Sequence, residues 1–248
     1  LNISNQNISD LTGIETLLFL EDLDCSSNNI STISLFEFPQ LLILNCSNNQ
    51  ISNIDFSNNL LLERIYAVNN QLTSLDISSL LLLQTIRVSN NQLSVFDPSN
   101  NGILSFIDCS NNQLFALDVS SNPNLSWFAC GGNQLQVLDL QNNPLIGKLY
   151  CNSNLLTSLD LTNQLSLNIL AASYNQIQLI DVSNSPSLAQ ISVQYNQLTT
   201  LNVKNGNNYN FNTFIQFYSN PNLTCIEVDD AAYSSASWSS IDPQHYFS

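Results

Sequence analysis

Basic side chains are scarce in this chain, whose 248 residues include 4 lysines and arginines against 19 acidic residues. The formal net charge of -15 argues against nucleic acid or an anionic membrane surface as a partner, because both repel an acidic protein. No apolar run approaches the ~18 residues of a membrane-spanning helix, and no signal-peptide pattern is present. Membrane insertion is therefore not expected.

Groups that perform chemistry are also rare. The single histidine, His245, has no nucleophile at a catalytic spacing, and the chain has neither a metal-ligand spacing nor a glycine-rich phosphate loop. An enzyme is therefore the least favoured class, and no cofactor is implied.

Methionine is absent and Leu1 already lies within the repeat pattern described below, which indicates a fragment of a longer precursor. Few charges (9%) and many Asn, Ser and Thr residues favour a secreted or cell-surface protein over a cytosolic one.

What the chain does contain is one repeated segment. Residues 104–124 read LSFIDCSNNQLFALDVSSNPN, and the pattern recurs every 21 residues on both sides. The spacing L-x-x-L-x-C-x-x-N-x-L is the leucine-rich-repeat signature. Apolar residues at alternate positions, such as Ile107 and Cys109, indicate a short strand with one buried face. One unit cannot bury that face alone, but units stacked about 4.8 Å apart close the interior and pair their strands in parallel.

The sequence therefore predicts a leucine-rich-repeat solenoid. This fold is a curved right-handed superhelix with a parallel β-sheet on the concave face, short extended or turn segments on the convex face and little helix. The array should occupy residues 1–228, with about 10–11 units of 21 residues. A three-residue insertion near residues 204–211 is expected to protrude as a loop. The module is expected to act as a monomer.

The repeat pattern stops after Val228, and residues 229–248 are expected to form a C-terminal cap over the last open unit. Asp230, with its neighbour Asp229, can cap a short helix that lays Tyr233 and Trp238 over that unit. The single histidine is expected on the surface of this cap.

Two polar columns recur at the repeat spacing. A buried amide in the turn after each strand can donate to a carbonyl and accept from an N–H, so the first column is predicted to be structural. It consists of Asn28, Asn49, Asn70, Asn91, Asn112, Asn133, Asn154, Asn175 and Asn196.

The second column is acidic and consists of Asp55, Asp76, Asp97, Asp118, Asp139, Asp160 and Asp181. Each carboxylate is expected to accept the N–H two residues on, as an Asx turn, and a calcium-binding ladder is the alternative.

Five of the six cysteines share one interior column, in which other repeats carry alanine or valine. They are Cys25, Cys46, Cys109, Cys130 and Cys151. Because alanine also occurs in this column, the position requires only a small apolar side chain, which a reduced cysteine provides. Three cysteines in consecutive repeats cannot all form disulfides with one another, so a reduced ladder is predicted. The column offers no histidine or carboxylate, so metal binding is not expected. Cys225 aligns with exposed positions such as Thr200, and a disulfide to a cysteine beyond Ser248 is a hypothesis.

The repeats resemble those of a known family. The units LDCSSNNIS, LNCSNNQIS and IDCSNNQLF, with the continuation LDVSSNPNL, are similar to the internalin-J-like cysteine-ladder repeats of bacterial surface proteins. The opening ISDLTGIETLLFLEDL resembles ordinary internalin repeats, and the ending NPNLTCIEVDDAAYSSASWSSIDP resembles the C-terminal cap of secreted leucine-rich-repeat proteins of the Bacteroidetes group. The resemblance implies a bacterial, extracellular, surface-attached binding protein, often an adhesin, without catalysis.

A binding surface is predicted on the concave face, where strand residues alternate with the buried column. Three of the four basic residues fall there beside aromatic residues, over about 19 Å at the strand spacing. Aromatic residues and arginine dominate binding hot spots. The predicted patch is Arg64, Tyr66, Arg87, Phe106, Trp127, Lys148 and Tyr150. Phe214 lies in the same columns, and Tyr174, Tyr195 and Tyr218 could extend the patch from the strand exits.

Three functions remain open at this point. The leading hypothesis is a non-catalytic extracellular module that binds a partner protein. A carbohydrate-binding module for an acidic polysaccharide is the rival, because aromatic rings can stack on sugars while Arg and Lys hold carboxylates or sulfates. The third is a structural spacer, in which the aromatic residues only stabilise the sheet and Arg87 pairs with Asp108 for less than about 1 kcal/mol.

Overall fold

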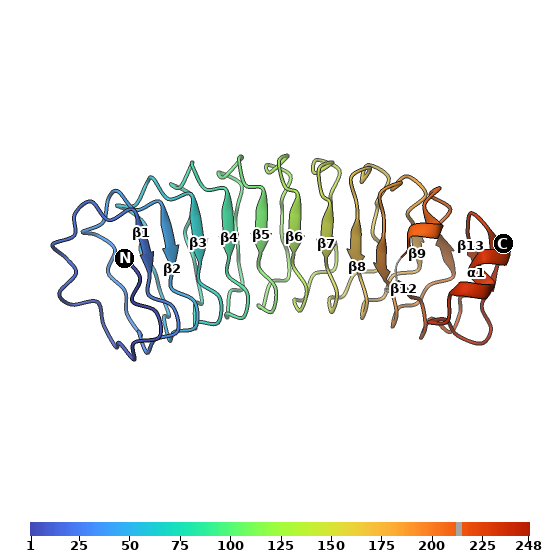
Figure 1. The fold of residues 1–248 in the computed structure, drawn as a ribbon, viewed down its shortest axis with the longest axis horizontal. Coiled ribbons are helices and arrows are strands. Elements are labelled where there is room, and N and C mark those ends of the chain that lie inside the picture. The colour runs from blue at the N-terminus through green and yellow to red at the C-terminus, as the bar shows by residue number, and fades with distance from the viewer. Residues whose placement is uncertain (212–214) are drawn as a thin grey trace. The chain divides into compact units, whose positions relative to one another are not determined.

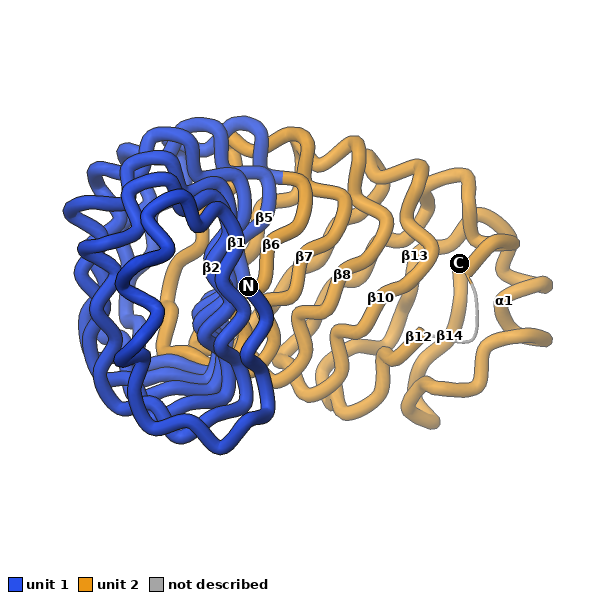
Figure 2. The backbone as a smooth tube through the Cα atoms, turned by 60° about the vertical axis from the view of Figure 1, so that its left-hand side comes forward, with its two compact units in different colours: residues 1–125 blue, residues 126–248 orange. Residues whose placement is uncertain are grey.

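The computed structural model describes residues 1–211 and 215–248. Short strands recur along the chain, the sheets are parallel, and α1 (Ala231–Ser237) is the one α-helix in the described part of the chain. The predicted leucine-rich-repeat solenoid is confirmed. The chain forms two compact units, residues 1–125 and residues 126–248, which Figure 2 distinguishes by colour.

Unit 1 is built on one parallel sheet (Figure 1). Its strands are β1 (Asp22–Asp24), β2 (Ile43–Asn45), β3 (Arg64–Tyr66), β4 (Thr85–Arg87) and β5 (Phe106–Asp108). Each strand pairs with the next at a shift of one 21-residue repeat, as in the partners Leu23 and Leu44. The middle residue of every strand points inward and is fully buried, while its two neighbours face outward. This alternation is the pattern that the sequence predicts.

Unit 2 contains two parallel sheets. The first continues the repeat strands as β6 (Trp127–Ala129), β7 (Lys148–Tyr150), β8 (Ile169–Ala171), β10 (Gln190–Ser192) and β12 (Ile215–Gln216). The second consists of β9 (Leu179–Asp181), β11 (Thr200–Asn202), β13 (Cys225–Glu227) and β14 (Tyr246–Phe247). The second sheet is formed by the other half of the last repeats, where the sequence predicts a second short strand or an extended turn.

The predicted asparagine column is buried, with 6–9% of each residue exposed. Asn154 is representative: its Nδ2 donates to the carbonyls of Cys130 (3.0 Å) and Cys151 (3.2 Å), and its Oδ1 accepts the N–H of Leu135 at 3.0 Å. Cys130 and Leu135 belong to the preceding repeat. The amide therefore closes its own turn, as predicted, and also links its repeat to the preceding one, which the sequence did not predict.

The residue before each of these asparagines has a positive φ. Asn48, Asn69, Asn90 and Asn111 take φ values of 53–56° there. Asparagine and glycine tolerate this left-handed conformation better than most residues. In each Asn-Asn pair, the first asparagine thus adopts the left-handed conformation of the turn, and the second places its amide in the interior.

The acidic column forms the predicted Asx turns. Asp55, for example, accepts the backbone N–H of Ser57 at 2.9 Å, and the same bond recurs at Asp76, Asp97, Asp118, Asp139, Asp160 and Asp181. The backbone and side-chain hydrogen bonds from Ser57 lower the pKa of Asp55. Within the described residues, no three His, Cys, Asp or Glu side chains come together as a metal site.

A second buried polar column was not anticipated from the sequence. Asn59 is fully buried, and its Nδ2 donates to the carbonyls of Leu35 and Phe38, both at 2.9 Å. Asn101 and Asn122 make the equivalent bonds in later repeats. Gln164 and Ser185 occupy the same column further on, so side chains of three kinds perform one role.

The cysteine column is buried, as predicted. Cys25, Cys46, Cys109, Cys130 and Cys151 have 0% of their surface exposed, and no disulfide joins cysteines anywhere in the described chain. Cys225 lies apart from the column, in register with Thr200 on the second sheet, and its Sγ is 3.0 Å from the Oγ of Ser248.

The predicted cap helix is present as α1. It begins at Asp230, whose carboxylate accepts the N–H groups of Ala232 and Tyr233. Trp238 follows the helix and is 7% exposed, with its ring packed against those of Phe211, Phe217 and Phe247. These rings close the apolar end of the unit. No helix in the described chain has the length and apolar character needed to cross a membrane.

The insertion near residues 204–211 is tied to the start of the cap. It contains a single 3₁₀ turn, η1 (Asn208–Asn210). Asp229 accepts the N–H groups of Gly206 and Asn208, at 2.9 and 3.1 Å, and donates its own N–H to the Oδ1 of Asn208 at 2.8 Å. Asn208 is fully buried. The segment is thus part of the packing between the last repeats and the cap, and does not only protrude.

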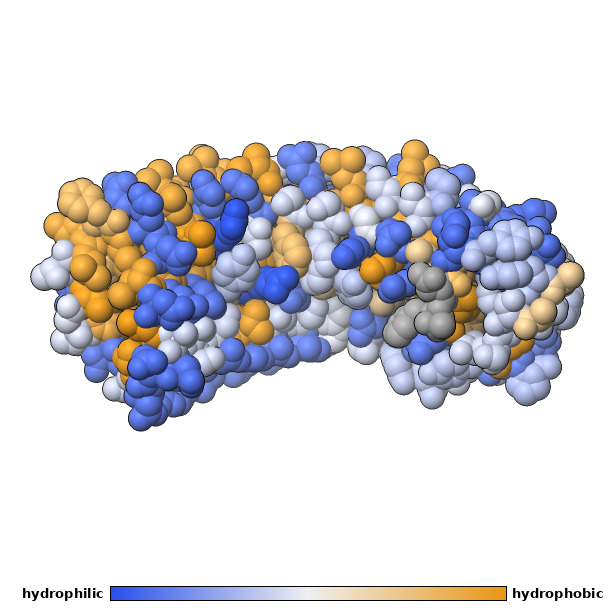
Figure 3. Space-filling model, viewed as in Figure 1, coloured by the Kyte–Doolittle hydropathy of each residue, from blue (hydrophilic) through white to orange (hydrophobic). Residues whose placement is uncertain are grey.

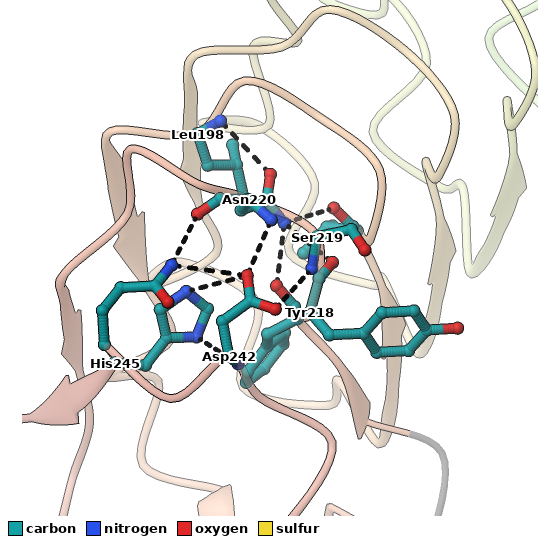
Figure 4. A network of polar contacts seen from close by, with 9 residues as sticks. Leu198, Tyr218, Ser219, Asn220, Asp242 and His245 are labelled. Atoms are coloured by element: carbon teal, nitrogen blue, oxygen red, sulfur yellow. Dashed lines mark hydrogen bonds and ion pairs between the residues drawn. The ribbon is translucent and has the colours of Figure 1, made fainter.

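The prediction that His245 lies on the cap surface is wrong. Its side chain is buried, its Nδ1 accepts the N–H of Asp242 at 3.2 Å, and its Nε2 lies 3.5 Å from the Asp242 carboxylate (Figure 4). The same carboxylate accepts the N–H groups of Ser219 and Asn220, both at 2.9 Å. Asp242 therefore donates a hydrogen bond to Nδ1 and places its carboxylate near Nε2, which has no hydrogen-bond partner among the described residues.

Candidate binding surface

The outward-facing residues of the repeat strands form the candidate surface. All seven residues of the predicted patch lie at the surface: Arg64, Arg87 and Lys148 are exposed, and Tyr66, Phe106, Trp127 and Tyr150 are half-buried. Each is an end residue of a three-residue strand whose middle residue is buried. Rigid strands therefore fix the direction in which these side chains leave the backbone. Phe214, the other aromatic residue predicted for these columns, falls outside the described residues.

In unit 1 the patch residues gather around Arg87. Its guanidinium carbon lies 4.5 Å from the centre of the Phe106 ring and 6.0 Å from that of Tyr66. Both distances are within the range of cation–π attraction. We call Arg64, Tyr66, Arg87 and Phe106 the arginine cluster. It combines two guanidinium groups with two aromatic rings on the three consecutive strands β3, β4 and β5.

Asp108, the register partner of Arg87, is held in place by its own contacts. Its carboxylate accepts the hydroxyl of Ser89 at 2.9 Å and the N–H of Ser110 at 3.2 Å. The arginine cluster is therefore bordered by a fixed negative charge. That arrangement restricts which charged groups of a ligand can approach from this side.

In unit 2 the patch residues form a second group, the tryptophan cluster of Trp127, Lys148 and Tyr150. Trp127 and Lys148 are partners in register on β6 and β7. The ring centres of Trp127 and Tyr150 are 5.3 Å apart, with the planes tilted by 41°. Burial raises the pKa of Tyr150 above its ordinary value. The cluster presents an aromatic pair beside an exposed ammonium.

A third aromatic group lies at the strand exits of unit 2. Tyr174 and Tyr195 are stacked with ring centres 4.4 Å apart and planes at 12°, and Tyr218 meets Tyr195 edge-on at 5.6 Å. Tyr174 is 53% exposed and Tyr195 is 44% exposed. The sequence pointed to these tyrosines only as an extension of the patch, whereas they form a stack of their own.

Exposed apolar residues are concentrated elsewhere. Leu17, Leu18 and Phe19, in the opening segment, are 42%, 51% and 87% exposed. On the face shown in Figure 3, hydrophobic side chains gather over the N-terminal repeats of unit 1. This apolar surface is distinct in character from the arginine cluster, which mixes charge with aromatic rings.

Comparisons with known proteins identify solved structures that share the fold. No family model matches the sequence, and no curated protein matches it. Among solved structures, the functional domain of InlJ from Listeria monocytogenes, which includes a cysteine ladder, is similar at 31% identity and a TM-score of 0.79. The match covers 93% of this chain and 49% of the InlJ chain, so this chain spans about half the length of that protein.

Two further structures share the fold at lower identity. An internalin of L. monocytogenes, InlF, is 22% identical over 97% of this chain and 84% of its own, with a TM-score of 0.69. The plant peptide hormone receptor RGFR1, solved in complex with RGF2, is 22% identical over 94% of this chain and 41% of its own, with a TM-score of 0.70. The InlJ domain includes a cysteine ladder, and this chain has a buried column of cysteines. This common feature is a more specific similarity than the leucine-rich-repeat fold alone.

Proposed function

We propose that this leucine-rich-repeat solenoid is a non-catalytic, extracellular module of a bacterial protein, which binds a partner protein through the outward face of its repeat strands. The observation that carries this proposal is the position of the basic residues. Three of the four in the chain, Arg64, Arg87 and Lys148, stand on that face beside aromatic side chains. Core packing gives no reason for this placement, because these residues point away from the interior.

The chemistry of the two clusters suits a protein ligand. A guanidinium packed over an aromatic ring still presents N–H donors at its edge, which can pair with carboxylates and backbone carbonyls. Tyrosine and tryptophan offer large contact areas with few rotatable bonds, so ordering them on binding costs little entropy. RGFR1, which shares the fold, was solved in complex with RGF2. These features favour recognition by a preformed surface.

The composition and the similarity to internalins support an extracellular location, either secreted or attached to the cell surface. Adhesion to another protein is the corresponding role. We further infer that residues 229–248 form a C-terminal cap of the kind found in secreted Bacteroidetes leucine-rich-repeat proteins.

A binding screen with matched variants tests the proposal. The full chain is labelled and applied to an array of extracellular protein domains, in parallel with Arg87→Ala and Trp127→Ala. At least one array protein should bind the native chain, and either variant should weaken that binding at least about tenfold, as expected for a hot-spot residue. Lys204→Ala removes the fourth basic residue, outside both clusters, and Phe115→Ala removes a 66% exposed aromatic ring elsewhere. Both controls should bind like the native chain.

An acidic polysaccharide is the second candidate, favoured by the exposed cations beside the aromatic rings. Binding of polygalacturonate that is lost in Arg64→Ala, Arg87→Ala and Lys148→Ala would support it over a protein ligand. If neither class of ligand distinguishes the cluster variants from the controls, the proposal fails and a structural spacer remains.

A further inference from the structure

Tyr174 and Tyr195 stand at positions where the backbone disfavours a bulky residue. Both have a φ of 56° and directly precede a buried column asparagine. In other repeats this left-handed position holds asparagine, glycine or serine: Ser27, Asn48, Asn69, Asn90, Asn111, Gly132, Ser153 and Ser219. A tyrosine in this conformation is uncommon and strained relative to asparagine or glycine. Folding therefore gives no reason for two aromatic residues here, and strained residues often mark functional sites.

The two tyrosine rings form an exposed stack. Because Tyr195, in the following repeat, covers one face of the Tyr174 ring, the other face is directed toward the preceding repeat. The corresponding positions of the preceding repeats are Ser153 and Gly132, which are too small to cover an aromatic ring. With 53% of Tyr174 exposed, an open aromatic face remains. Tyr218 supports the other end of the stack edge-on.

The stack has few charged neighbours. At its Tyr218 end, the carboxylate of Asp242 in the cap accepts the N–H groups of Ser219 and Asn220. Between residues 161 and 226 the chain has two charged residues, Asp181 and Lys204. Asp181 belongs to β9 and Lys204 follows β11, both in the second sheet, whereas the tyrosines follow β8, β10 and β12 of the first. The three strands that precede these tyrosines, β8, β10 and β12, therefore carry no charged residue, and the next strand of the sheet, β7, carries Lys148.

Uncharged hydrogen-bonding groups are fixed next to the stack. The Nε2 of Gln194, the residue before Tyr195, donates to the Oε1 of Gln216 at 2.9 Å. The hydroxyl of Ser192 lies 2.7 Å from the Oε1 of Gln194 and 3.1 Å from that of Gln216. Gln216 is half-buried on β12, whereas Ser192 and Gln194 are buried, so Gln216 is the member of this network that reaches the surface. The network holds an amide in one orientation on the strand face.

From these observations we propose that Tyr174, Tyr195 and Tyr218 form a binding site for a neutral carbohydrate chain. A sugar ring has an apolar C–H face that packs on an aromatic ring, and hydroxyl groups that bond to amides and hydroxyls. An open tyrosine face beside fixed uncharged amides supplies both. The site is independent of the proposed protein partner, because it uses none of the residues of the arginine or tryptophan cluster.

Affinity electrophoresis of the full chain tests this site. The acidic chain migrates through native gels that contain a soluble β-1,3-glucan, xyloglucan, galactomannan or starch, with polygalacturonate as the charged comparison. At least one neutral polymer should retard the native chain. The double variant Tyr174→Asn/Tyr195→Asn places at both positions the residue used by other repeats, so it should fold, and it should bind that polymer at least about tenfold more weakly.

Three controls keep the result interpretable. Thermal melting checks that the double variant is folded, and Tyr246→Asn removes a 57% exposed tyrosine from the second sheet. Arg87→Ala and Trp127→Ala, which test the protein-binding clusters, should leave carbohydrate binding unchanged. The proposal is overturned if no neutral polymer retards the chain, if the folded double variant is retarded equally, or if polygalacturonate alone binds. Binding of a proline-rich peptide that is lost in the double variant, without carbohydrate binding, would assign the site to a protein ligand.

Discussion

The guanidinium carbon of Arg87 lies 4.5 Å from the centre of the Phe106 ring on the next strand. If this contact is a genuine cation–π interaction, Arg87→Ala and Phe106→Ala should be coupled. A double-mutant cycle measured by urea unfolding should give a coupling free energy of about 0.5–1 kcal/mol, the usual range at an exposed site.

The matched control for this cycle is Arg64, an exposed arginine of the same cluster for which the described residues provide no comparable ring contact. Arg64→Ala combined with Phe106→Ala should show no coupling. A value near zero for Arg87 and Phe106 as well would mean that the two side chains only share a surface. Strong coupling combined with unchanged ligand binding would favour a stabilising role alone.

Asn154 should be among the residues most sensitive to substitution. Asn154→Ala leaves the N–H of Leu135 without its acceptor and removes the donor to the carbonyls of Cys130 and Cys151. Each unsatisfied buried group costs about 1–3 kcal/mol, so the variant should lose roughly 2–5 kcal/mol of unfolding free energy. Chemical denaturation measures this loss. Asn163→Ala, at an exposed position, should change it by less than about 0.5 kcal/mol.

The first asparagine column could be predicted because the same residue recurs at a fixed spacing in nine repeats. The second could not, because the residue type in that column changes from Asn59 to the apolar Leu80 and later to Gln164 and Ser185. The alternation of apolar and other residues along each strand likewise predicted which strand residues face the interior and which face outward. It could not show that Arg87 leans over Phe106, because that contact depends on side-chain rotamers and not on the repeat period.

The cap and the tyrosine stack show the same limit. Asp230 could be recognised as a helix cap because the signal is local in sequence. The burial of His245 depends on Asp242 and on the packing of residues 24 or more positions away, such as Asn220. The change from asparagine to tyrosine at Tyr174 is visible in the sequence. Its significance depends on the positive φ, which only the structure provides.

Cys151 should tolerate alanine better than serine. Its thiol is fully buried, and Ala172 occupies the same column in the next repeat. Cys151→Ala should therefore cost about 1 kcal/mol of unfolding free energy for the lost apolar volume. Cys151→Ser places a hydroxyl there and should cost about 1–3 kcal/mol more if that hydroxyl finds no partner. Equal losses in the two variants, measured by chemical denaturation, would contradict an apolar column.

Thiol labelling should separate Cys225 from the cysteine column. Burial raises the pKa of the Cys151 thiol to about 12 and, with a contribution from Asp24, that of Cys25 to about 12. Iodoacetamide at pH 8 should therefore modify Cys225, which is half-buried, and leave the column intact until the chain unfolds. Mass spectrometry of the labelled protein identifies the modified residues. Rapid labelling of Cys151 in the folded chain would mean that the interior opens.

The cap should loosen in acid because of Asp242. Partial burial raises the pKa of this carboxyl, but the hydrogen bonds from Ser219 and Asn220 and the nearby His245 outweigh that effect and hold the pKa below its ordinary value. A pKa that is lower in the folded state stabilises the fold above the unfolded value of about 3.9, and this stabilisation is lost as the pH falls through the folded value. The stability of the cap should therefore be constant near neutral pH and decline below about pH 4.

Trp238 fluorescence can report this change, since the indole packs within the cap. In a Trp127→Phe background Trp238 is the sole tryptophan, and its emission should shift to longer wavelength as the cap opens in acid. Asp242→Asn removes the titrating group, so this variant should have a looser cap at neutral pH and a shallower acid transition. The comparison is necessary because carboxylates of the acidic column, such as Asp160, also have lowered pKa values and titrate in the same range. An acid transition of identical midpoint and amplitude in the Asp242→Asn variant would show that these other carboxylates, and not the contacts of Asp242, govern the cap.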